Sequence, residues 1–99
     1  MPIPAVTPVK IDHITVILKE GMPTILRIDP YRLFFYAGDR DEPQHIHVER
    51  DDSVAKFWLT PIRLQSSGGF TRREINRTHQ LIEEHHNRLV EEWHEYFGR

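Results

Sequence analysis

Apolar and polar residues alternate with two different periods along the chain. Between Thr24 and Leu64 the alternation is close to every second residue and is broken into short runs, which is typical of half-buried β-strands. From Ile75 onward, apolar residues recur at spacings of three, four and seven, which predicts one amphipathic helix that ends at Gly98. Together the two patterns predict an α+β fold, in which a small antiparallel β-sheet of about three to five strands is packed on one face by a long C-terminal α-helix.

The start of this helix carries a local signal. Thr71 and Glu74 have the spacing of a capping box, in which each side chain accepts a hydrogen bond from a backbone N–H that the helix leaves unpaired. Gly68 and Gly69, just upstream, allow the chain to turn into the helix. We therefore expect the helix to begin directly after Thr71.

The first 21 residues differ in character from the rest. Three of the seven prolines lie within residues 1–8, and the alternation slips between Ile11 and Ile14. We expect residues 1–21 to be an N-terminal extension that can contain one extra strand, and residues 22–99 to form a single α+β domain. A chain of 99 residues can bury one hydrophobic core, because a second core would need roughly 50 residues of its own.

Two alternating runs, residues 45–50 and 53–60, are separated by two aspartates, where a tight turn would join them into a hairpin. Because successive side chains of a strand point to opposite faces, the hairpin divides into an apolar and a polar face. The apolar face, which must meet the helix, consists of Ile46, Val48, Ala55, Phe57 and Leu59. The opposite face, which we expect to be open to solvent, consists of His45, His47, Glu49, Lys56 and Trp58, with Val54 as its only aliphatic member.

The two histidines of the polar face stand at i and i+2 of one strand, about 6.5–7 Å apart at the backbone, so they can converge on one ion or one phosphate. In a first interpretation, His45 and His47 bind a divalent metal ion. A carboxylate would complete the ligand set, and the sequence offers Glu49, Asp39 or Asp41.

Other interpretations assign the same residues to catalysis or to partner binding. In metal-free RNA cleavage, His45 and His47 would act as general acid and base, while Lys56 would stabilise developing negative charge. Trp58 would offer a surface on which a base stacks. As a protein-binding surface, the same face would comprise His45, His47, Glu49, Lys56 and Trp58, with the tryptophan as an anchor. The simplest alternative is a polar face with solvated histidines.

Four arginines near the helix start form a second candidate site, an anion-binding one; they are Arg63, Arg72, Arg73 and Arg77. Cations at this end oppose the helix dipole, which favours negative charge there. The four arginines indicate either a phosphate site built with the free amides of the helix start or ion pairs with loop acids such as Asp39, Asp41 or Glu42. DNA binding through this cluster is a further alternative, although no helix-turn-helix pattern accompanies it.

Composition narrows the range of partners. The formal net charge is −2, with 13 basic and 15 acidic residues, which argues against strong non-specific binding to nucleic acid. The chain contains no cysteine, which excludes disulfides and thiolate zinc sites and favours a reducing compartment, the cytoplasm. Apolar runs span only a few residues, so we expect no membrane segment.

Several motifs resemble those of the small bacterial domain-of-unknown-function family numbered four-one-six-zero. They are residues 31–36 (YRLFFY), residues 42–50 (EPQHIHVER), residues 55–59 (AKFWL) and a closing stretch that contains Trp93 and Gly98. The resemblance covers Met22 to Gly98, and Gln44 stands where the family often has a second proline.

The resemblance implies a bacterial protein with a cognate protein partner, because members of the family resemble companions of another small domain in two-gene units of the toxin–antitoxin kind. It implies no particular activity, so whether the chain is an enzyme stays open. We expect an interaction component that docks a small partner protein through the open sheet face. The alternatives are a small ribonuclease that uses His45 and His47, with or without a divalent metal, and a DNA-binding autoregulator.

Overall fold

The structure is a computed structural model, and it describes residues 9–11, 14–16 and 24–98. Two short strands come first, β1 (Val9–Ile11) and β2 (Ile14–Val16). The main sheet and its covering elements follow in chain order: β3 (Thr24–Ile28), β4 (Tyr31–Phe34), the 3-10 helix η1 (Ala37–Asp41), β5 (His45–Arg50), β6 (Ser53–Leu59), β7 (Ile62–Ser66), α1 (Arg72–Glu84) and α2 (His86–Phe97).

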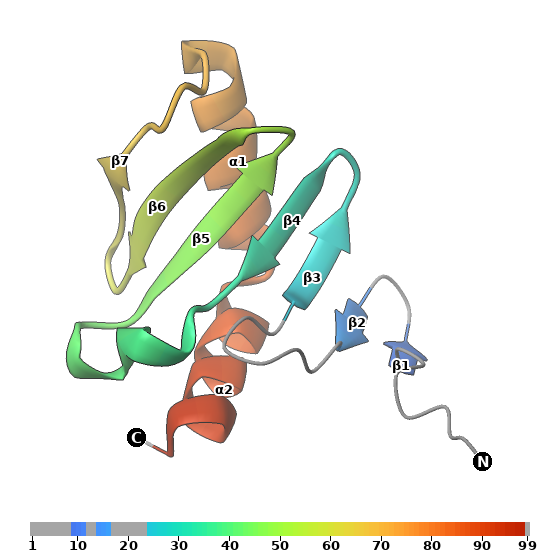
Figure 1. Cartoon of the computed structure of the whole chain (residues 1–99), viewed down its shortest axis with the longest axis vertical. Coiled ribbons are helices and arrows are strands. Elements are labelled where there is room, and N and C mark those ends of the chain that lie inside the picture. The colour runs from blue at the N-terminus through green and yellow to red at the C-terminus, as the bar shows by residue number, and fades with distance from the viewer. Residues whose placement is uncertain (1–8, 12–13, 17–23, 99) are drawn as a thin grey trace.

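The main sheet has five strands in the order β3-β4-β5-β6-β7, and every neighbouring pair is antiparallel. Both helices lie behind the sheet in Figure 1, so they cover the same face. This arrangement confirms the predicted α+β fold class. We call the helix-covered side the inner face and the opposite side the outer face.

The central hairpin has the predicted register. Its cross-strand pairs are His45–Trp58, Ile46–Phe57, His47–Lys56, Val48–Ala55 and Glu49–Val54. The turn residue Asp51 has φ 53°, a left-handed conformation that aspartate tolerates better than most side chains. The five predicted inner-face residues of this hairpin are completely buried, and they pack with Leu81, Ile82, Leu89 and Trp93 of the helices.

The helical segment begins as predicted and then departs from the prediction. Thr71 caps α1, its side chain accepts the backbone N–H of Glu74, and the Glu74 side chain bonds back to the Thr71 backbone. In place of one continuous helix there are two, because His85 leaves the helical conformation with φ −116° and ψ 19°. At this break the His86 ring lies 2.6 Å from the Leu59 carbonyl oxygen, a hydrogen bond that fixes α2 to the end of β6. The apolar periodicity continues through the break, so the sequence pattern could not show where the helix is interrupted.

The link from β7 to α1 passes against the backbone of β6. Gly68 has φ +57°, and a Cβ atom at this position would lie 1.7 Å from the Val54 carbonyl oxygen. Gly69 also has a positive φ, of 95°. Only glycine combines the left-handed backbone with this close approach.

Within residues 1–21, where one extra strand is predicted, the structure describes two short antiparallel strands, β1 and β2, with Ile11 opposite Ile14. The slip in alternation between these two isoleucines coincides with the end of β1 and the start of β2. Residues 1–8, 12–13 and 17–23 lie outside the described residues. Among the described helices, none combines the length and the apolar character that crossing a membrane requires.

Candidate functional site

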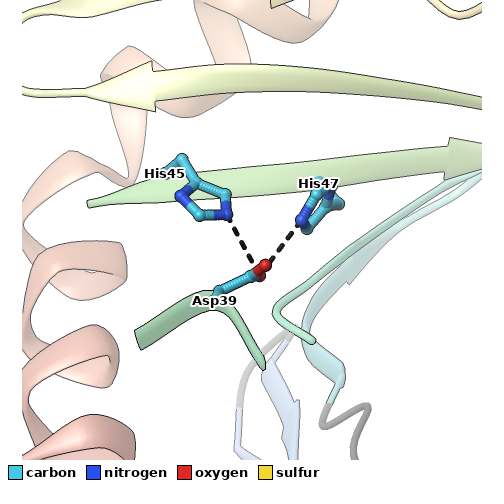
Figure 2. A group of neighbouring side chains, drawn as sticks. All are labelled: Asp39, His45 and His47. Carbon is cyan, nitrogen blue, oxygen red and sulfur yellow. Dashed lines mark hydrogen bonds and ion pairs between the residues drawn. The ribbon is translucent and has the colours of Figure 1, made fainter. Parts of the chain in front are cut away.

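The outer face is covered at the start of β5, contrary to expectation. His45 is completely buried and His47 is 8% exposed. The polar segment between β4 and β5 forms η1 and brings Asp39 against the two imidazoles (Figure 2). The expectation that both histidines face solvent was therefore wrong, because a carboxylate of the chain replaces water as their partner.

One oxygen of Asp39 is the centre of this cluster. The Oδ2 atom accepts the backbone N–H of Tyr36 at 2.8 Å, and it lies 3.0 Å from His47 Nε2. His45 Nε2 lies 3.1 Å from the same oxygen (Figure 2). The nitrogen and oxygen atoms that the three side chains offer all lie within 4.8 Å of one another.

The second ring nitrogen of His45 determines its tautomer. His45 Nδ1 lies 2.8 Å from the Pro43 carbonyl oxygen. A carbonyl can only accept, so Nδ1 carries a proton and donates it. In the neutral ring Nε2 is then unprotonated, and it presents a lone pair to the cluster.

The sequence model of a family described as Domain of unknown function (DUF4160) matches residues 31–94. This chain belongs to that family. The match confirms the resemblance seen in the sequence, over a slightly shorter stretch than Met22 to Gly98. It spans the strands β4 to β7, η1 and all three members of the cluster. No curated protein and no solved structure matches the chain.

Aromatic rings surround the two histidines of this DUF4160 domain. The His45 ring makes edge contacts with Trp58 and Trp93, at centroid distances of 5.7 and 5.2 Å. The His47 ring stacks on Phe34 at 5.3 Å and meets Tyr36 edge-on at 4.6 Å. The polar cluster therefore lies in a largely apolar enclosure, where electrostatic interactions are stronger than in water.

The Asp39 carboxyl group is ionised at neutral pH. Burial by itself raises its pKa, but the interactions with His45, with His47 and with the Tyr36 N–H outweigh burial and hold the pKa far below its usual value. A charged carboxylate beside two imidazoles suits metal binding or an ion pair with a protonated histidine. Acid–base catalysis on RNA finds no support here, because both Nε2 atoms point at Asp39 and away from solvent.

The remaining members of the predicted site are only partly exposed. Glu49 pairs with Arg32 at 2.7 Å, so of the three carboxylates that could complete a metal site the structure brings only Asp39 to the histidines. Lys56 pairs with Glu42 at 2.6 Å, and its ammonium lies 4.9 Å from the centre of the half-buried Trp58 ring. Of the five residues predicted to bind a partner, Glu49, Lys56 and Trp58 stay partly accessible, whereas His45 and His47 do not.

The four arginines predicted to form an anion site do not converge. Arg63 lies opposite Trp58 on the outer face of β7, and Arg73 is exposed on α1. Arg72 lines a groove between β7 and α1, whereas Arg77 lines a different hollow beside Arg27. The predicted ion pairs with Asp39 and Glu42 are also wrong, because those carboxylates are engaged by the histidines and by Lys56.

Sequence reasoning missed two features of the domain. Arg50 at the end of β5 pairs with Glu74, which joins the central hairpin to the first turn of α1. Tyr36, which is 39% exposed, supplies both the N–H that holds Asp39 and an aromatic ring beside His47. A YRLFFY run followed by a polar segment signals a strand end, but nothing in it indicates which rings remain at the surface.

Proposed function

We propose that this DUF4160 protein is the interaction component of a bacterial two-protein module of the toxin–antitoxin kind, acts in the cytoplasm, and binds a small cognate protein. The binding surface is the accessible part of the outer face, which we define as Tyr36, Glu49, Lys56 and Trp58. The observation that carries the proposal is the presence of two accessible aromatic rings on this face, with Tyr36 39% exposed and Trp58 half-buried.

The chemistry of this surface suits a protein partner. Tyrosine and tryptophan are the side chains that most often anchor protein interfaces, because they bury a large apolar area and keep a polar tip. The charged residues between them are already paired, Lys56 with Glu42 and Glu49 with Arg32. A partner therefore need not neutralise them, and we expect it to offer an apolar recess for the rings.

The alternatives draw less support. A ribonuclease would need an imidazole that reaches the substrate, but His45 is completely buried and His47 nearly so. A DNA-binding autoregulator would need its arginines on one surface, and they lie on different sides of β7 and α1.

Co-expression with the product of the adjacent gene tests the proposal. We expect the two proteins to co-purify, and we expect Tyr36→Ser and Trp58→Ala to weaken the complex by about 2 kcal/mol or more, a roughly thirtyfold rise in Kd by titration calorimetry. Leu64→Ser is the matched control, because Leu64 is 38% exposed, close to the 39% of Tyr36, but lies on the helix side of β7.

Two results would contradict the proposal. The first is an adjacent product that fails to bind the wild-type chain, and the second is a complex that Leu64→Ser weakens as much as Tyr36→Ser does. Circular dichroism must confirm that each variant is folded. Charge reversal at Lys56 is a less selective test, because it also breaks the pair with Glu42.

A further inference from the structure

The cluster of Asp39, His45 and His47 contains a nitrogen that is left without a hydrogen bond. The His45 side chain has no exposed surface, and its Nε2 atom makes no hydrogen bond with any described residue. The nearest acceptor, Asp39 Oδ2, already receives the Tyr36 N–H and lies within hydrogen-bond distance of His47. Since a carboxylate oxygen has two lone pairs, no acceptor site remains for a third donor. A buried polar atom in this state costs free energy unless something else satisfies it.

We propose that Asp39, His45 and His47 bind a divalent transition-metal ion, which accepts the free lone pair of His45 Nε2. The two Nε2 atoms lie 3.0 and 3.1 Å from Asp39 Oδ2. In a tetrahedral zinc site with bonds near 2.1 Å, neighbouring ligand atoms are about 3.4 Å apart. Each histidine in Figure 2 therefore needs to move only a few tenths of an ångström away from Asp39 Oδ2 to admit the ion, and the donor atoms of the three side chains already lie within 4.8 Å of one another.

The surroundings of the cluster favour the metal-binding forms of His45 and Asp39. Metal ligation through Nε2 requires the proton to be on Nδ1, and Pro43 holds it there through its carbonyl oxygen at 2.8 Å. The Tyr36 N–H orients the Asp39 carboxylate in the same way. Such second contacts are what distinguish a prepared metal site from histidines that meet by chance.

The donor set selects the class of ion. Two imidazole nitrogens and one carboxylate oxygen suit ions such as Zn²⁺, Fe²⁺, Co²⁺ and Ni²⁺. Mg²⁺ and Ca²⁺ prefer several oxygen ligands, of which this cluster offers one. Copper(I) favours thiolate ligands, and the chain has no cysteine.

The ion would join segments that are far apart in the chain. Asp39 comes from η1 and the histidines come from β5, while the His45 ring also contacts Trp93 of α2 at 5.2 Å. A bound metal would thus fix the covering turn to the sheet and to the second helix. This role is independent of the partner proposed above.

The test uses full-length, tag-free protein stripped with a chelator and titrated with ZnCl₂ and, separately, CoCl₂. We expect one equivalent of either ion to bind, and cobalt to give visible d–d absorption bands of tetrahedral strength. Cobalt should also quench the intrinsic fluorescence, because both tryptophans of the chain contact the His45 ring. These readouts need no variant.

Variants then assign the ligands. Asp39→Asn and His47→Gln should each lower the zinc affinity at least about tenfold. His79→Gln is the matched control, because His79 lies 3.7 Å from Glu83 on the surface of α1 and offers the competing histidine–carboxylate pair. It should leave the affinity unchanged.

Three outcomes would overturn the proposal. One is wild-type protein that binds no stoichiometric metal. Another is zinc binding that His79→Gln abolishes and Asp39→Asn preserves. The third is cobalt binding without tryptophan quenching, which would place the ion elsewhere. If a variant fails to fold, the cobalt spectrum and quenching of the wild type decide the question.

Discussion

The two faces of the sheet are buried by different means. On the inner face, apolar side chains of the strands meet apolar side chains of two helices, and residues such as Phe57 and Ile82 have no exposed surface. On the outer face, burial is confined to one end, where the carboxylate of Asp39 reaches the histidines from a single short turn. The inner face is thus held by many non-directional contacts, and the covered end of the outer face by a few directional ones.

The inner face therefore supplies stability, whereas the covered end of the outer face supplies the polar groups that could bind a ligand. Apolar packing spreads its free energy over many contacts, so losing one residue removes only a share of it. A polar cluster concentrates its free energy in a few groups, each of which is costly when it loses its partner. Three changes, taken from the largest expected effect to the smallest, test this contrast.

The first change truncates the inner face. We expect Phe57→Ala to lower the free energy of unfolding by about 3–5 kcal/mol, because it removes a completely buried ring and leaves a cavity. Urea denaturation measures the effect. Leu64→Ala is the control and should cost less than about 1 kcal/mol, since Leu64 is 38% exposed. Equal losses in the two variants would mean that the inner face is not the main source of stability.

The second change removes the centre of the outer-face cluster. In metal-free protein, Asp39→Ala should cost about 1–3 kcal/mol, because the Tyr36 N–H and the His47 ring lose their shared acceptor. Arg40→Ala, on an exposed neighbour within the same turn, should be close to neutral. Denaturation in the presence of a chelator measures both. If the two variants behave alike, the turn is not held by its carboxylate.

The third change concerns pH and the ion pair at the start of α1. The hydrogen bond from the Thr71 N–H and the pairing with Arg50 lower the pKa of Glu74. A lowered folded-state pKa contributes stability above the unfolded value near 4.3, and this contribution is lost as the pH falls through the folded value. The melting temperature of the wild type should therefore fall further between pH 7 and pH 3 than that of Glu74→Gln.

Differential scanning calorimetry across this pH range measures the difference. Between pH 7 and pH 9, where Glu74 is ionised in both the folded and unfolded states, the wild type and Glu74→Gln should change in parallel. An equal or larger acid loss in the variant would show that ionised Glu74 does not stabilise the folded protein.

Local patterns were enough to predict the strands and the faces. The register of the central hairpin follows from the two-residue turn at Asp51 and Asp52, and the period of two then assigns each side chain to a face. The position of η1 could not be predicted, because a polar segment has no period that says which surface it lies against. The distance between Asp39 and His45 is set by tertiary folding alone.

The arginines show a second limit of local reasoning. Arg72 and Arg77 are close in sequence, but five residues along a helix turn a side chain by roughly 140° relative to the first. The two therefore line hollows on different sides of α1. Proximity in sequence suggested a cluster, but helix geometry separates Arg72 from Arg77.

Gly68 has a consequence for recognising distant relatives of this domain. Its backbone passes so close to Val54 that any larger residue would force the connection between sheet and helices to move. A relative that has glycine at this position but another residue in place of Asp39 would keep the fold and lose the cluster of Asp39, His45 and His47. Loss of the glycine, in contrast, would mark a chain whose helices approach the sheet along a different route.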